Sequence, residues 1–216
     1  MKNQTLFFIC GPHCSGKTSI IRDLGKEFPA LITGHEIGKE FYYKRKAAGF
    51  STDGAGEKFE FEVADAELSR DHGLSVGSHA LMETWHPGNL AYALMRNPAA
   101  APRLASYIKS SSRIIGSGRV IGVRILVSRE NISKRTRTFA DAPEWAADFY
   151  TAISSLIPSA LQMLGLEKHT VTVDGNQGYD AVKARIREIL LTDRNSFLDF
   201  RKYSDYDSLI PVWKNQ

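Results

Sequence analysis

The residues best suited to chemistry stand together near the start of the chain, in the stretch CGPHCSGKTS. Gly11, Gly16, Lys17 and Thr18 have the spacing G-x-x-x-x-G-K-[ST] of a phosphate-binding loop (P-loop). Glycines there let backbone N–H groups surround a phosphate chain, the lysine reaches the terminal phosphates, and the threonine hydroxyl can ligate Mg²⁺. The loop therefore predicts a nucleoside triphosphate and Mg²⁺ as ligands, with the lysine facing solvent when the loop is empty. The residues expected to bind them are Gly11, Pro12, His13, Cys14, Ser15, Gly16, Lys17, Thr18 and Ser19.

Such a loop works only between a strand and a helix, and the flanking sequence has that form. An apolar run precedes the loop, and apolar residues at helical spacing follow it from Ile20 to Phe28. Further β-prone runs alternate with helical patterns, which indicates βαβ units. We therefore expect an α/β fold, a three-layer sandwich with a mainly five-stranded parallel sheet, as in P-loop NTPases. The expected strands are 6–10, 30–33, 79–83, 119–127 and 170–173.

Three segments depart from this alternation. Residues 109–119 are rich in serine and glycine and are predicted to form a loop. Residues 135–145 are polar, include a proline and resemble a movable flap between two helices. The last segment, 195–216, mixes aromatic and charged residues without clean periodicity. We therefore expect one domain over 1–194, followed by a C-terminal tail.

Composition bounds the class of protein. The chain has 216 residues, of which 43% are hydrophobic and 24% charged, which is ordinary for a globular protein with one substantial core. No apolar run approaches the roughly 18 residues that a membrane span needs, and the start lacks a secretory signal. The only cysteines, Cys10 and Cys14, flank a glycine-rich turn and suit a reducing compartment. These features predict a cytoplasmic protein without a membrane partner.

Charge is unevenly distributed along the chain. Residues 103–137 contain nine Lys or Arg and one acid, whereas 53–71 contain seven acids and two basic residues. The basic stretch suits a polyanion such as a nucleotide or a nucleic acid strand. A solvated helix face would explain it equally well.

A second chemical group is the carboxylate of Glu83, at the end of the expected strand 79–83. G-proteins, motor ATPases and kinases share the P-loop, but the N-K-x-D signature of G-proteins is missing from this sequence. A carboxylate at the carboxyl end of a parallel strand faces the crevice where such sheets bind ligands. Glu83 is therefore a candidate general base or Mg²⁺-positioning group, and the alternative is a helix-capping acid.

Around Glu83 the chain resembles thymidylate kinases and their deoxynucleoside kinase relatives. The stretch GSHALMETWHPGNLAYAL resembles the family's strand ending in Asp-Arg-aromatic, followed by a small residue and Ala-Tyr. TGHEIGKEF, ADAEL, ILVSRENISKRTRTF and VDGNQGYDAVKARIREIL resemble further family segments, so that the likeness covers most of 5–191. It implies a nucleotide kinase-like fold with a helical lid over about 129–145, and ATP with Mg²⁺ as cofactors.

The resemblance also implies roles for residues outside the P-loop. Arg135 and Arg137 correspond to lid arginines that cover the transferred phosphate, and a basic solvated helix end is the alternative. Asn176 and Gln177 would lie beside the donor adenine, or they are plain turn residues. The catalytic set predicted on this basis is Lys17, Glu83, Arg135 and Arg137, with Thr18 and Glu83 at the metal.

Two departures concern the acceptor. The family has arginines where this chain has Thr84 and Ala66, and those arginines would hold the acceptor's phosphate and base. Thymidine monophosphate is therefore expected to be a poor acceptor, unless Arg70, His72 or His79 compensates. Downstream of Thr84, we expect His86 to be a turn residue and Trp85 and Tyr92 to pack in the core or line the acceptor pocket.

Together these features predict an enzyme that moves the γ-phosphate of ATP to a nucleoside, nucleotide or related hydroxyl acceptor. Two alternatives remain at this point: a nucleic-acid kinase or nucleic-acid-modifying enzyme on the same fold, and a catalytically inactive nucleotide-binding regulator. The sequence also leaves open a nucleic acid partner and a homodimer.

Overall fold

The computed structural model describes residues 5–49, 56–75, 77–117, 119–138 and 143–192. Its centre is a sheet of five parallel strands, as the sequence predicts, and the strand order is β2-β3-β1-β4-β5. The strands are β1 (Thr5–Cys10), β2 (Ile32–Gly34), β3 (His79–Glu83), β4 (Arg119–Leu126) and β5 (Thr170–Asp174). All five carboxyl ends therefore lie at one edge of the sheet, which is where α/β proteins of this kind bind ligands.

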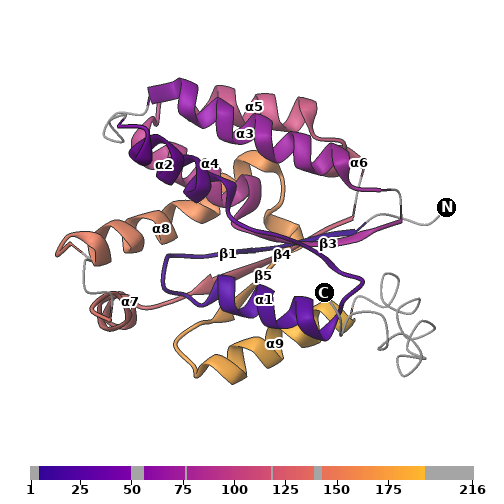
Figure 1. The fold of residues 1–216 in the computed structure, drawn as a ribbon, viewed down its shortest axis with the longest axis vertical. Helices are drawn as coiled ribbons and strands as arrows, with labels where there is room; N and C mark the ends of the chain where they lie inside the picture. Colours follow the sequence, from indigo (N-terminus) through magenta and orange to yellow (C-terminus); the bar gives the residue numbers. More distant parts are fainter. Residues whose placement is uncertain (1–4, 50–55, 76, 118, 139–142, 193–216) are drawn as a thin grey trace.

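Helices cover both faces of the sheet (Figure 1). One face carries α1 (Lys17–Glu27) and α9 (Tyr179–Thr192), and the other carries the remaining long helices. The remaining helical segments are α2 (Ile37–Ala47), α3 (Gly56–Gly73), α4 (Trp85–Arg96), α5 (Ala101–Ser111), α6 (Arg113–Ser117), α7 (Arg129–Thr136), α8 (Ala146–Leu164) and η1 (Glu167–His169).

The central strand β1 shows why its sequence is apolar without alternation. Leu6, Phe8 and Cys10 pack on the face with α4, α5 and α8, whereas Phe7 and Ile9 pack on the face with α1 and α9. Every residue of β1 is buried. A parallel strand covered on both faces needs apolar side chains at every position, and this fixes β1 as the middle of the three layers.

The predicted loop over 109–119 is wrong, because helix α5 continues to Ser111 and a short helix α6 follows. The serine between them caps the second helix: the Ser112 hydroxyl accepts a hydrogen bond from the backbone N–H of Ile115 at 3.2 Å. Ile114 is buried in the core. A serine at a helix start and an apolar face explain the helix, where composition alone suggested a loop.

Helices α3 and α4 pack antiparallel through polar side chains, which we call the polar ladder. Three carboxylates of α3, from the acidic stretch 53–71, are buried. Each carboxylate contacts a residue of α4: Glu60 contacts Arg96, Glu67 contacts Asn89, and Asp71 contacts Trp85 and His86. His86 is thus a fully buried residue of α4, and the prediction of a turn residue is wrong.

The proposed tail, 195–216, lies outside the described residues, as do 139–142 of the predicted lid. No helix in the described ranges combines the length and apolar character that crossing a bilayer requires.

Candidate active site

The P-loop joins β1 to α1 in the predicted strand–loop–helix arrangement. Gly16 precedes the helix in the left-handed region, with φ of 89°. At Gly11 a β-carbon would stand 2.8 Å from the carbonyl oxygen of Ile125 on β4, so only glycine fits that close approach. The Ser15 hydroxyl is buried without a hydrogen-bond partner among the described residues. Glycines that expose backbone N–H groups and a spare hydroxyl fit a bound phosphate chain.

Lys17, the first residue of α1, is only 5% exposed, so the expectation of a solvent-facing lysine is wrong. Its ammonium donates hydrogen bonds to the carbonyl oxygens of Gly11 at 3.0 Å and Pro12 at 2.9 Å. The ammonium is therefore folded back over the loop, where it meets any phosphate that the loop binds. Because carbonyls carry no net charge, the lysine keeps its full positive charge in this position.

Thr18 and Glu83 meet across the loop, although they lie 65 positions apart in the sequence. The Thr18 hydroxyl donates a hydrogen bond to Glu83 Oε1 at 2.6 Å, and Glu83 is 5% exposed. A hydroxyl and a carboxylate oxygen at the mouth of a phosphate loop are the ligand types that Mg²⁺ takes from proteins. The residues predicted for the metal therefore fit it. Glu83 does not cap α4, because Thr84 occupies that position.

The backbone just after Glu83 is strained. Thr84 has φ of 67° and ψ of −55°, and Trp85 also has a positive φ. A β-branched residue rarely adopts this region, at a cost of about 1–3 kcal/mol that the surrounding structure must offset. Gly88 allows it, because a β-carbon there would stand 2.3 Å from Thr84 Cγ2. The Thr84 N–H donates to the Ile9 carbonyl at 2.8 Å and anchors this turn to β1.

The two predicted lid arginines have different surroundings. Arg135 on α7 donates hydrogen bonds to the Cys14 carbonyl at 3.2 Å and the Gly175 carbonyl at 2.7 Å, so it connects the P-loop with the turn after β5. Arg137 is exposed just beyond the end of α7. Of the two, Arg135 is the one beside the phosphate loop.

Asn176 and Gln177 lie in the turn between β5 and α9, and their surroundings also differ. The Asn176 side-chain oxygen accepts hydrogen bonds from the Ser128 N–H at 2.8 Å and the Asn131 amide at 2.9 Å. The side-chain nitrogen of Asn176 donates to Asp174. Asn176 thereby ties this turn to the start of α7, whereas Gln177 is exposed.

Glu36, at the carboxyl end of β2, is a residue that sequence reasoning missed. It is 7% exposed, and its carboxylate makes no hydrogen bond or ion pair with another described residue. A buried unpaired carboxylate is costly and marks a place where a ligand can supply the missing donor. The sequence contained a sign of this role, because Glu36 stands near the carboxyl end of a parallel strand, as Glu83 does.

Aromatic rings surround this carboxylate and the P-loop. His13 of the loop stacks on Tyr150 of α8 with ring centroids 4.6 Å apart, and on Tyr92 of α4 at 5.9 Å. Burial raises the pKa of both tyrosines, and the negative charge of Glu36 raises them further. Burial and the positive charge of Lys17 lower the pKa of His13 to about 3, so this ring is neutral. A carboxylate beside stacked rings suits a ligand with an aromatic part and hydrogen-bond donors.

Comparison with solved structures finds this fold in several kinases. Thymidylate kinase from Candida albicans matches with a TM-score of 0.66 and 14% identity, over 90% of this chain and 94% of that chain. Deoxyadenosine kinase from M. mycoides, bound to its products dCMP and dCDP, matches with a TM-score of 0.57 and 10% identity, over 87% and 97%. The fold is that of the thymidylate and deoxynucleoside kinases.

A third similar structure is the YorR protein of Bacillus subtilis, in complex with phosphorylated GDP. Its TM-score is 0.54 and its identity 20%, over 86% of this chain and 96% of that chain. No family model and no curated protein matches the sequence. Identities this low establish a shared kinase fold, so the chemistry has to be argued from the site.

The candidate substitutes for the missing phosphate-binding arginines lie elsewhere or are already partnered. Ala66 packs against the small apolar cluster of α2 and α3. His79 begins β3 and so lies at the edge of the sheet opposite Glu83, about 13 Å along the strand. His72 is exposed near the end of α3.

The arginines of α2, α3 and α4 are instead paired with glutamates. Arg45 lies 3.4 Å from Glu62, and Arg96 grips Glu60 with two hydrogen bonds at 2.8 and 2.9 Å. Arg70, the candidate substitute, is bound to Glu67. Each of these guanidinium groups is already engaged by a glutamate, so it would have to give up that contact to hold an acceptor phosphate.

The basic stretch 103–137 does not form one surface. It runs through α5, α6, β4 and α7, and α5 and α7 pack on different faces of the sheet: Ile108 of α5 belongs to the core cluster of one face and Ile132 of α7 to that of the other. Several of its cations are paired: Arg103 with Glu57, Arg129 with Asp148, and Lys134 with Glu130. The charge run therefore lends no support to a nucleic acid groove.

Proposed function

We propose that this protein transfers the γ-phosphate of ATP, in the presence of Mg²⁺, to a free hydroxyl of a small acceptor that carries an aromatic ring, such as a nucleoside. The observation that carries the proposal is the 2.6 Å contact between Thr18 and Glu83 beside the Lys17 ammonium. A loop that only bound a nucleotide would have no use for a buried carboxylate at the phosphate end of the site.

Each group has a role that follows from its surroundings. Thr18 and Glu83 would hold Mg²⁺, which when bound neutralises phosphate charge during transfer. Lys17 and Arg135 stabilise the negative charge that builds on the transferred group and the departing ADP. Among the described residues, both cations are bound by backbone carbonyls, so phosphate oxygens can replace those partners.

Glu36 acts as the general base for the acceptor hydroxyl. The acceptor oxygen forms a bond to the γ-phosphorus while the bond from that phosphorus to the bridging oxygen breaks, and ADP leaves. The hydroxyl proton passes to the Glu36 carboxylate, which is buried and has no other described donor. Tyr92, Tyr150 and His13 supply ring surfaces for the rest of the acceptor.

The acceptor is a free nucleoside rather than a monophosphate. An acceptor phosphate would place two or more negative charges beside Glu36 and among arginines that are already engaged by glutamates. A bidentate arginine is the usual holder of such a phosphate, and the family's positions for it are Thr84 and Ala66 here.

The test is a screen of ATP consumption over deoxynucleosides, ribonucleosides, their monophosphates, and DNA and RNA oligonucleotides. We expect a nucleoside to give the highest specificity constant, and thymidine monophosphate to fall well below the ordinary enzyme range of about 10⁴ M⁻¹s⁻¹. Efficient use of a monophosphate would refute the acceptor class, and phosphorylation of oligonucleotide ends would favour a nucleic-acid kinase. ATP binding without any turnover would point to a regulator.

A further inference from the structure

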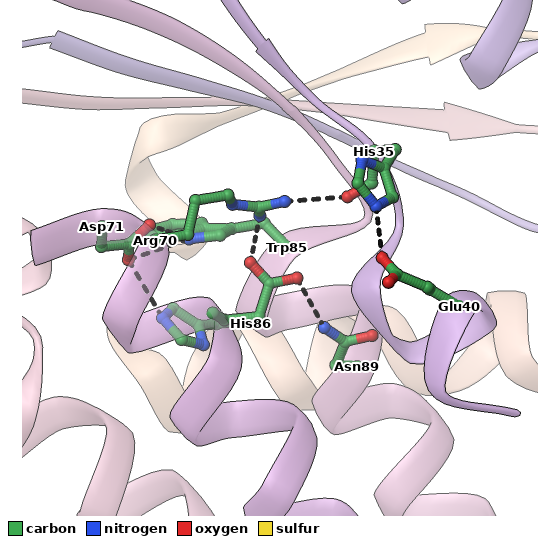
Figure 2. Close-up of polar contacts among 8 residues, drawn as sticks. His35, Glu40, Arg70, Asp71, Trp85, His86 and Asn89 are labelled. Carbon is green, nitrogen blue, oxygen red and sulfur yellow. Dashed lines mark hydrogen bonds and ion pairs between the residues drawn. The ribbon is translucent and has the colours of Figure 1, made fainter. Parts of the chain in front are cut away.

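The short segment that carries Glu36 is held in place by side chains from two other helices. Arg70 of α3 donates a hydrogen bond from Nη1 to the His35 carbonyl at 2.8 Å (Figure 2). A β-carbon on Gly34 would stand 2.9 Å from that same nitrogen. Two residues after Glu36, a β-carbon on Gly38 would stand 2.9 Å from Asn89 Oδ1 of α4. The backbone on both sides of Glu36 is therefore in close contact with Arg70 and Asn89.

One carboxylate fixes both of these contacts. Glu67 of α3 is fully buried, and its two oxygens accept hydrogen bonds from Arg70 and from the Asn89 amide, the latter at 3.0 Å. The chain of contacts runs from Asn89 through Glu67 and Arg70 to the carbonyl of the residue that precedes Glu36.

We propose that Glu67, Arg70 and Asn89 are positioning residues that set the place of the Glu36 carboxylate at the acceptor site. This inference rests on the proposed function. A buried ion pair contributes little net stability compared with apolar side chains of similar volume, so a role in geometry accounts better for this one. A reacting group must be held within about 0.5 Å by groups that are themselves fixed, and the Glu67 network supplies that restraint.

Arg70→Met tests the proposal, because methionine keeps an apolar stem and removes both donors. With ATP and the best nucleoside from the screen, we expect kcat to fall about 10- to 100-fold, as a misplaced catalytic group can cost. The KM for ATP and the slow hydrolysis of ATP without acceptor should stay unchanged, because Arg70 touches neither the P-loop nor Glu83. Arg45→Met is the matched control: the Arg45 side chain also pairs with a glutamate of α3 and is 30% exposed, but among the described residues no hydrogen bond or ion pair joins that side chain to 34–38.

A double-mutant cycle separates positioning from general stability. If Arg70 acts through Glu36, then adding Arg70→Met to Glu36→Gln should cause little further loss of kcat. Multiplicative losses would overturn the proposal, and so would equal losses of acceptor-dependent and acceptor-independent turnover. Should Arg70→Met fail to fold, Arg70→Lys keeps the ion pair with Glu67 but lacks the fork that reaches the carbonyl, and the same kcat loss is expected. If the wild-type protein is inactive on every acceptor, the proposed function is refuted. If the wild-type protein is active and Arg70→Met has the same kcat, only this inference is refuted.

Discussion

The two sides of the site hold their cations in opposite ways. On the nucleotide side, Lys17 and Arg135 are bound by backbone carbonyls of the P-loop and the turn after β5. On the acceptor side, the arginines of α2, α3 and α4 are bound by glutamates. The difference concerns net charge: a carbonyl satisfies the donors of a cation without cancelling its charge, whereas a carboxylate cancels it.

This contrast explains how one crevice can treat its two substrates differently. The nucleotide side keeps uncompensated positive charge, which attracts a polyphosphate. The acceptor side offers arginines already engaged by glutamates, a carboxylate without a partner among the described residues, and aromatic rings, which suit an uncharged or positively charged molecule. The field across the site therefore favours one substrate that is strongly anionic and one that is not.

The largest loss of turnover should follow from replacing Lys17, the cation at the centre of the nucleotide side. Lys17→Met removes the charge and keeps most of the buried stem, so the protein should fold and lose turnover by about three orders of magnitude or more. Steady-state ATP consumption with the best acceptor measures it, with circular dichroism to confirm the fold. A variant that retained a tenth of wild-type turnover would contradict the assignment of the P-loop lysine.

Glu83→Gln tests the metal end of the site. Glutamine keeps the size and the contact with Thr18 but removes the charge, so turnover should fall by about two to four orders of magnitude. ATP binding measured without Mg²⁺ should change little, while the Mg²⁺ concentration needed for half-maximal rate should rise. Unchanged turnover with a lower melting temperature would instead assign Glu83 a structural role.

Arg135 and Arg137 provide a comparison within the nucleotide side. Arg135→Ala removes the cation that bridges the P-loop and the β5 turn, and we expect turnover to fall about 100-fold. Arg137 is exposed, so the loss of turnover in Arg137→Ala should be at least tenfold smaller than in Arg135→Ala. Equal losses would show that position beside the P-loop in this structure does not identify the catalytic arginine.

The nucleotide side could be predicted from the sequence because its groups are nearly consecutive. Gly11 to Thr18 form a motif whose spacing is set by the wrapping of backbone around phosphates, and the flanking apolar strand and helix confirm the context. The sheet was predictable for a similar reason, because strands covered on both faces are short, apolar and separated by helical patterns. Only the boundaries differ, as where β2 covers Ile32–Gly34 instead of 30–33.

The acceptor side could not be predicted in the same way. Glu36 comes from the segment before α2, Glu67 and Arg70 come from α3, and Asn89 comes from α4. Their residue types are those of an ordinary helix surface. Whether such a residue faces solvent or a neighbouring helix depends on how α3 packs against α4, which periodicity does not reveal when the contact face is polar. The antiparallel pairing of Glu67 with Asn89 and of Asp71 with His86 becomes visible only in three dimensions.

The smallest expected effect is on the free energy of unfolding, through the buried Glu67 on the acceptor side. Burial raises the pKa of Glu67 from its ordinary 4.5 to about 8, with the nearby charges of Asp71 and Glu36 adding to the rise, and with the charge of Arg70 and a hydrogen bond from Asn89 opposing it. The folded protein therefore holds a proton on Glu67 that the unfolded chain releases above about pH 4.5. By linkage, the free energy of unfolding is highest below pH 4.5 for this group and falls as the pH rises toward 8.

Glu67→Gln isolates this contribution, because glutamine has nearly the same shape and does not titrate. Between pH 6 and pH 7, the free energy of unfolding of the wild type should fall by about 1 kcal/mol relative to the variant, since a single group gives at most about 1.4 kcal/mol per pH unit. Urea unfolding of both proteins at each pH measures the difference. Parallel pH profiles would mean that Arg70 keeps Glu67 ionised throughout this range, and the acceptor side would then hold a permanent ion pair at its centre. Such an outcome would strengthen the contrast with the nucleotide side, because the Arg70 charge would be cancelled at every working pH.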